Sequence, residues 1–146
     1  MAPVIRAVID TNVFASGVLG LARAQSIPGE IFRQWRKHSF LLITAQAIIE
    51  EVERVLATPF FVERIPASES AAAIDALRQE AVLTVITTEV RGIATHPEDD
   101  VVLAVAVSAA ADFLVTGDKQ LQRLETYQGV RIVSPREFLA FLPVPD

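Results

Sequence analysis

The sequence lacks cysteine entirely and is poor in histidine, with two histidines among 146 residues. Without cysteine the chain can form no disulfide framework and has no thiolate for catalysis or for a cysteine-rich zinc site. Proteins without disulfides are typical of a reducing compartment, and we expect this one to be cytoplasmic. Any metal ion bound by this chain would therefore have mainly oxygen ligands.

Several familiar motifs are also absent. The chain has no glycine-rich phosphate loop, no Walker sequence and no Gly-x-Ser-x-Gly elbow, which excludes P-loop nucleotide chemistry and the usual serine hydrolase arrangement. The longest apolar run, residues 101–115, is too short to span a bilayer, so we expect no membrane association. The N-terminal residues are typical of a strand rather than of a signal peptide.

Basic residues are outnumbered by acidic ones, 13 to 18, which gives a formal net charge of −5 and a pI near 5.0. This balance argues against a module that coats a nucleic-acid duplex. It does not exclude a nuclease whose acids bind metal cations. The mean hydropathy is +0.39, which is high for a small monomer, so we expect a homodimer or higher oligomer, or another protein, to cover part of the apolar surface.

Strand-like and helix-like segments alternate along the chain, which predicts one α/β domain over residues 1–146 with a mainly parallel sheet. The helix that follows Asp100 is apolar in nearly every direction, so we expect it to be buried. The predicted strands cover residues 4–9, 40–44, 82–87, 113–116 and 130–133. The predicted helices cover residues 28–38, 45–56, 68–80 and 99–111, and a last helix is capped by Ser134.

Four acidic positions share one place in this predicted topology, at or beyond the carboxyl ends of strands. In parallel α/β sheets ligands bind at that edge, so we expect these side chains to converge. Carboxylates about 5 Å apart repel each other by roughly 3 kcal/mol at an effective dielectric constant near 20. Such a cluster takes up protons or binds a cation, and oxygen ligands favour Mg²⁺ or Mn²⁺. The candidates are Asp10, Glu51, Asp99 or Asp100, and Asp118.

Each acid also has a structural interpretation. Asp10 could cap the helix that follows the first strand, and Thr11 or Asn12 could share that role; of these we predict Thr11 as the cap. One of Asp99 and Asp100 could cap the buried helix. Asp118 could be a turn residue. His38 and His96 are more typical of surface positions than of catalysts.

Helical geometry sorts the acids of the helix 45–56 only in part. Glu50 and Arg54 point away from the apolar face, and their spacing predicts a solvated ion pair. Glu51 and Glu53 flank that face on opposite sides, so geometry does not choose between them.

Four segments together resemble a PIN domain: "VIDTNVF", "ITAQAIIEEVERVL", "HPEDDVVLAVAVSAAADFLVTGDKQL" and "VRIVSPREFLAF". Among PIN domains the chain is similar to the VapC-like toxins of prokaryotic toxin–antitoxin systems. The resemblance implies a three-layer α/β/α fold and a metal-dependent endoribonuclease that uses Mg²⁺ or Mn²⁺. It also implies an RNA substrate and a small antitoxin partner, whose peptide we expect in an apolar groove near Ile31, Phe32 and Trp35.

The resemblance assigns roles residue by residue. The implied catalytic metal ligands are Asp10, Glu51, Asp99 or Asp100, and Asp118, with Asn12 and Thr116 as supporting polar residues. The chain departs from the family pattern at Ala45, where serine is frequent, and at His96, where aspartate is usual. Two alternatives stay open: a PIN-fold interaction protein without significant nuclease activity, and a DNA flap-type nuclease. Candidates for RNA contact are Arg33, Arg36, Lys37, Lys119, Arg123 and Arg131.

Overall fold

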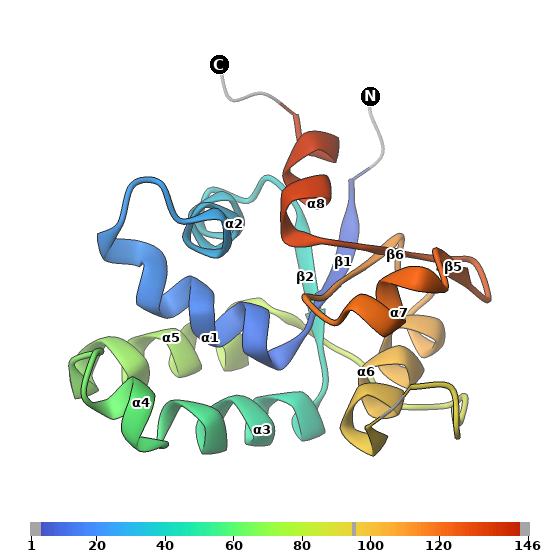
Figure 1. Ribbon diagram of the computed structural model, residues 1–146, viewed down its shortest axis with the longest axis horizontal. Coiled ribbons are helices and arrows are strands. Elements are labelled where there is room, and N and C mark those ends of the chain that lie inside the picture. The colour runs from blue at the N-terminus through green and yellow to red at the C-terminus, as the bar shows by residue number, and fades with distance from the viewer. Residues whose placement is uncertain (1–3, 95, 144–146) are drawn as a thin grey trace.

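A six-stranded sheet forms the centre of the computed structural model, which describes residues 4–94 and 96–143 (Figure 1). The strand order is β3-β2-β1-β4-β6-β5, and every neighbouring pair is parallel except β5 and β6. The sequence prediction of a mainly parallel sheet is therefore confirmed. The strands are β1 (Arg6–Ile9), β2 (Leu41–Thr44), β3 (Val82–Leu83), β4 (Phe113–Val115), β5 (Thr126–Tyr127) and β6 (Val130–Val133).

Helices cover both faces of this sheet, which gives the predicted three-layer α/β/α architecture. Figure 1 shows α1 and α3 on one side of the strands and α6 on the other. Helix α1 packs against α2 and α3, whereas α6 packs against β1 and β4. The helices are α1 (Thr11–Leu19), α2 (Ile27–Arg36), α3 (Gln46–Leu56), α4 (Pro59–Val62), α5 (Ala67–Glu80), α6 (Pro97–Ser108), α7 (Lys119–Arg123) and α8 (Pro135–Phe141), with a 3₁₀ turn at Gly20–Ala22.

The central strands are apolar on both faces because helices lie above and below them. Ala7 and Val8 of β1 and Leu114 and Val115 of β4 are fully buried. Ala7 pairs with Leu42 on one side and with Phe113 on the other, so β1 lies in the middle of the register. This register brings the carboxyl ends of β1, β2 and β4 to the same edge of the sheet.

Helix α6 is largely buried, as its apolar sequence predicts: five consecutive residues from Val102 to Ala106 lie in the core. It begins at Pro97, two residues before the predicted start. Proline is well suited to the first position of a helix because its missing N–H would have no partner there. The Ser134 cap of α8 is confirmed, and the Glu137 side chain completes a capping box with it.

The strand predicted over residues 82–87 is mostly wrong. Only Val82 and Leu83 pair with β2, and the chain then leaves the sheet. The backbone N–H groups of Thr87 and Thr88 donate to the hydroxyl of Ser108 at the end of α6, at 2.9 and 3.0 Å. The hydroxyl of Ser108 thus takes the place of the backbone acceptor that a neighbouring strand would provide. Helices α4 and α7 and strand β5 were not predicted, since each is too short to show a periodicity.

The predicted peptide groove near Ile31, Phe32 and Trp35 is also wrong. All three side chains are buried, between 3% and 8% exposed. Phe14 of α1 packs against Phe32 and Trp35 with ring centroids 5.4 and 6.0 Å apart. The apolar stripe of α2 therefore faces the core, as such a stripe ordinarily does, and offers no surface to a partner. No helix in the described ranges is long and apolar enough to cross a membrane.

Candidate active site

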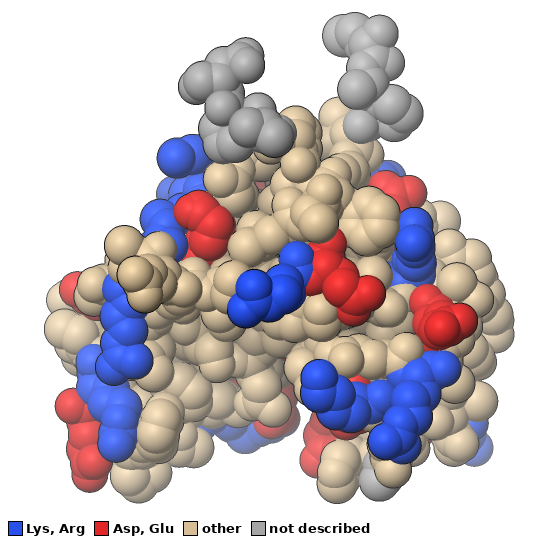
Figure 2. Space-filling view, turned by 45° about the horizontal axis from the view of Figure 1, so that its top comes forward, with Lys and Arg blue, Asp and Glu red and all other residues tan. Residues whose placement is uncertain are grey.

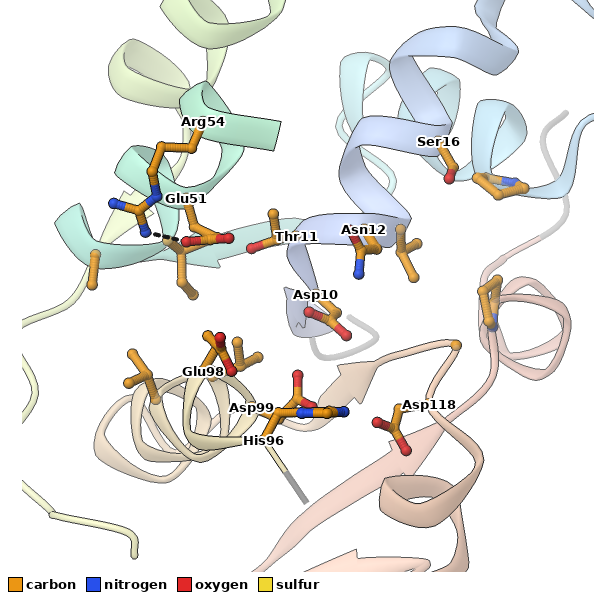
Figure 3. Close-up of a pocket in the computed structure, with 18 residues that line it drawn as sticks. Asp10, Thr11, Asn12, Ser16, Glu51, Arg54, His96, Glu98, Asp99 and Asp118 are labelled. Carbon is orange, nitrogen blue, oxygen red and sulfur yellow. Dashed lines mark hydrogen bonds and ion pairs between the residues drawn. The ribbon is translucent and has the colours of Figure 1, made fainter. Parts of the chain in front are cut away.

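A cavity of about 780 Å³ opens at the carboxyl end of the sheet, beside the point where the chain order reverses between β1 and β4. Ligands of open α/β sheets bind at such a crevice because the loops that follow adjacent strands diverge there. Figure 3 shows the predicted acids converging on this space from separate elements. The acids that line it are Asp10, Glu51, Glu98, Asp99 and Asp118.

Asp10 lies at the base of the cavity, directly after β1, and is 7% exposed. It occupies the N-cap position of α1, but its side chain makes no capping hydrogen bond. Instead its Oδ2 accepts a hydrogen bond of 2.8 Å from the hydroxyl of Thr116. The prediction that Thr11 caps α1 is wrong, since Thr11 is the first residue inside the helix. The Asp10 carboxylate therefore faces the cavity rather than the helix end (Figure 3).

Thr116 joins two of the acids. Its hydroxyl donates to Asp10 and also accepts a hydrogen bond of 3.1 Å from the backbone N–H of Asp118. Thr116 is fully buried, so its orientation is determined by its packing. Asn12, the other predicted supporting residue, is exposed on the rim of the cavity. In the described part of the chain its side chain hydrogen bonds to none of the acids.

Asp118 has two tasks. Its Oδ1 accepts hydrogen bonds of 2.8 and 3.2 Å from the backbone N–H groups of Gln120 and Leu121, which caps the short helix α7. The same side chain lines the cavity. The structural and functional interpretations of this residue are therefore compatible, because the cap orients the carboxylate without using Oδ2.

The structure separates Asp99 from Asp100. Asp99 lines the cavity and is half-buried, whereas Asp100 does not line it. Both oxygens of Asp100 accept backbone hydrogen bonds of 2.7 to 3.2 Å, from the N–H groups of residues 92–94. Neither residue is the N-cap of α6, which is His96. Geometry therefore favours Asp99 as the third acid of the site and gives Asp100 the task of holding the preceding loop.

Glu51 is the acid of α3 that lines the cavity, whereas Glu53 forms an ion pair with Arg78 of α5. The predicted Glu50–Arg54 pair is wrong. Arg54 binds Glu51 instead, three residues earlier on the same helix (Figure 3). The carboxylate of Glu51 raises the pKa of the Arg54 guanidinium. Glu51 thus holds a cationic partner in this structure.

The sequence prediction did not place three further polar or charged residues at the cavity, namely Arg54, Glu98 and Ser16. It also placed His96 among surface residues; His96 is exposed and at the same time borders the cavity beside Asp99. Glu98 precedes Asp99 in "PEDD", which was the available signal for it. Arg54 and Ser16 are ordinary helix residues in the sequence, and only the packing of α3 and α1 around β1 brings them to the cavity.

The cavity is electrostatically unfavourable for its own acids. Burial raises the pKa of the Asp10 carboxyl, the hydrogen bond from Thr116 opposes this rise, and the Asp118 carboxylate adds to it. Partial burial and the carboxylates of Asp10 and Asp118 raise the pKa of Asp99 to about 6. Burial is the main cause of both raised pKa values, and repulsion between the carboxylates adds to the cost of ionising Asp10 and Asp99.

A divalent cation fits this donor set. Apart from the imidazole of His96, the possible metal ligands that line the cavity are carboxylate and neutral oxygen atoms, which suits Mg²⁺ or Mn²⁺ rather than a soft metal. Within the described ranges no three acids are already close enough to hold an ion. Glu51 is paired with Arg54 instead. The ligand roles of Asp10, Glu51, Asp99 and Asp118 therefore stay predictions, favoured by their common cavity.

The sequence matches the PIN domain family over residues 6–120, from β1 through the start of α7. The chain is a PIN domain. PIN domains are nucleases that hydrolyse phosphodiester bonds. No curated protein sequence matches the chain.

Several solved structures share this fold at low sequence identity. VapBC2 from Rickettsia felis, bound to a DNA fragment from its promoter, aligns with a TM-score of 0.58 at 10% identity, over 89% of this chain and 98% of that one. The toxin VapC20 of Mycobacterium tuberculosis, which cleaves the sarcin-ricin loop, aligns with a TM-score of 0.56 at 17% identity, over 86% and 98%. PAE2754 from Pyrobaculum aerophilum aligns with a TM-score of 0.50 at 17% identity, over 93% and 88%.

Proposed function

We propose that this PIN domain is a metal-dependent endoribonuclease. The observation that carries the proposal is the meeting of Asp10, Glu51, Asp99 and Asp118 at one cavity on the carboxyl edge of the sheet. Such a grouping is unfavourable without a cation, because the nearby carboxylates raise the cost of ionising Asp10 and Asp99. The surplus of negative charge is what a site for Mg²⁺ or Mn²⁺ requires.

A bound Mg²⁺ or Mn²⁺ ion activates water and offsets the charge that develops on phosphate. The protein's own residues supply orientation. Thr116 holds one oxygen of Asp10 and positions the backbone of Asp118, so these two acids form a rigid pair beyond the carboxyl ends of β1 and β4. Asp118 is fixed further by the N–H groups of α7. Asp99 faces the cavity from α6 and Glu51 faces it from α3. The Glu51 side chain can rotate toward the other acids when its ion pair with Arg54 is broken.

The direct test is cleavage of a single-stranded RNA by the purified protein. We expect cleavage in Mn²⁺ or Mg²⁺ that leaves a 5′-phosphate and is abolished by EDTA. Mn²⁺ is also expected to raise the melting temperature, because a ligand that binds only the folded state stabilises it. Branched DNA serves as the competing substrate. Preferential cleavage of branched DNA would favour the flap-type nuclease, and Mn²⁺ binding without any cleavage would favour a PIN-fold interaction protein.

We further assign the protein to a toxin–antitoxin pair that acts in the cytoplasm. The support is the shared fold with VapBC2 of R. felis and with the RNA-cleaving VapC20 of M. tuberculosis. A small antitoxin and a second copy of the chain are the proposed partners. Several large apolar side chains on the surface, among them Phe60, Val62 and Val85, are available for such contacts.

Expression of the protein in bacteria is expected to arrest growth if it is a toxin. The arrest should be relieved by co-expression of the gene that lies next to it and should disappear when Asp10 is replaced by Asn. Colony counts after induction measure both effects. An active nuclease that leaves growth unchanged would contradict the toxin assignment and would indicate an RNA-processing enzyme.

A further inference from the structure

Arg54 is the single lysine or arginine among the described residues that line the acidic cavity. It extends from α3 beside Glu51, one turn farther along the helix (Figure 3). Five carboxylates face the same space. A polyanionic substrate therefore meets only one full positive charge of the protein there.

The ion pair between Arg54 and Glu51 is weak enough to open. The Arg54 side chain is 68% exposed and that of Glu51 is 30% exposed. Exposed pairs of this kind contribute little to stability, since solvent screens them and two side chains must be ordered. A divalent ion that draws Glu51 to the other acids would leave the guanidinium without its partner at the rim of the cavity.

We propose that Arg54 binds a phosphate group of the RNA strand beside the cleaved bond, after its release from Glu51. This inference rests on the proposed ribonuclease function. A guanidinium forms two parallel hydrogen bonds with a phosphate and cannot lose its charge at neutral pH, which makes it more suitable than a neutral rim residue such as Asn12. Glu51 and Arg54 would then exchange partners, one to the cation and the other to the substrate.

The other basic candidates are placed less favourably. None of the six basic residues suggested by the sequence lines the cavity. Arg33 pairs with Glu30 and Arg36 with Glu80. On the face shown in Figure 2, basic and acidic side chains are interspersed, without a continuous basic surface that could hold the RNA backbone. Substrate binding close to the reacting phosphate therefore falls to Arg54.

The test compares Arg54→Gln with Arg78→Gln. Arg78 forms the same kind of pair with a glutamate of α3, Glu53, away from the cavity, and so provides a matched control. Binding of a fluorescent single-stranded RNA is measured by anisotropy in Ca²⁺, which occupies oxygen-ligand sites. Binding of Mn²⁺ alone is measured by calorimetry. Steady-state cleavage in Mn²⁺ gives KM and kcat.

Arg54→Gln is expected to weaken RNA binding and to raise KM by at least about 10-fold, because the charge-assisted hydrogen bonds to the phosphate are lost, with kcat changed by less than about 3-fold. Mn²⁺ binding should stay equal or tighten by up to about 5-fold, since the competing guanidinium is gone. Arg54→Lys should restore part of the RNA affinity. Arg78→Gln should change none of these values.

Unchanged RNA affinity in Arg54→Gln, weakened Mn²⁺ binding, or the absence of RNA binding by the unmodified protein would overturn the proposal. Failure of the ribonuclease function has a different signature. In that case the unmodified protein binds Mn²⁺ and RNA without cleaving it, and the effect of Arg54→Gln on RNA binding is still seen.

Discussion

Replacing Asp10 with Asn is expected to abolish RNA cleavage while making the metal-free protein more stable. Substitution of residues that merely support metal ligands lowers affinity or activity about 10- to 100-fold, so loss of a buried ligand should cost at least about 100-fold. Burial raises the pKa of Asp10, which means that its ionised form disfavours the folded state. Asparagine removes this charge and still offers a carbonyl oxygen to the hydroxyl of Thr116.

The measurements are initial rates of RNA cleavage in Mn²⁺ and the melting temperature in EDTA at pH 7.5. Each kcal/mol gained should raise the melting temperature by about 2–4 °C in a domain of this size. Asp75→Asn is the matched control, because Asp75 is an exposed acid of α5 outside the cavity. An Asp10→Asn protein that cleaves RNA at the original rate would refute the metal mechanism. A clear loss of stability would refute the account of Asp10 as a strained carboxylate.

Asp99→Asn and Asp100→Asn are expected to have opposite consequences, although the residues are adjacent. The pKa of Asp99 in the folded protein is about 6, above its ordinary value of 3.8. The stability associated with this raised pKa is present at low pH and is lost as the pH rises through 6. Asp99→Asn should therefore leave stability unchanged below about pH 4 and increase it above pH 6, while it weakens Mn²⁺ binding.

Asp100→Asn should instead destabilise the protein by about 2–4 kcal/mol. Three backbone N–H groups donate to the two oxygens of Asp100, and an amide group offers one acceptor and turns a donor toward the others. Urea unfolding at pH 4 and 8 and calorimetry with Mn²⁺ distinguish the two variants. A stable Asp100→Asn protein that fails to bind Mn²⁺ would reverse the assignment and make Asp100 the ligand.

Sequence reasoning was most effective where a single segment contains the whole signal. The apolar run of α6 predicted its burial, and Ser134 predicted the cap of α8. The predictions were wrong where a side chain far away in the sequence determines the hydrogen-bond partners of a segment. The residues after Leu83 are as β-branched as a strand, but beyond Thr84 the chain leaves β2, and Ser108 of α6 provides the hydrogen-bond acceptor for Thr87 and Thr88. The spacing along α3 predicted that Arg54 pairs with Glu50, but in the structure the Arg54 side chain pairs with Glu51 instead.

The sequence by itself determined the main strands and helices, the family motifs and the set of candidate acids, because periodicity and motif spacing are local properties of the chain. Only the tertiary structure decided which of those acids share a cavity. Asp99 and Asp100 differ by one position, about 100° around a helix, which turns one carboxylate to the cavity and the other to the loop behind it. The partners of Asp10 are equally non-local: Thr116 lies 106 residues away, and the parallel pairing of β1 with β4 places its hydroxyl 2.8 Å from the carboxylate.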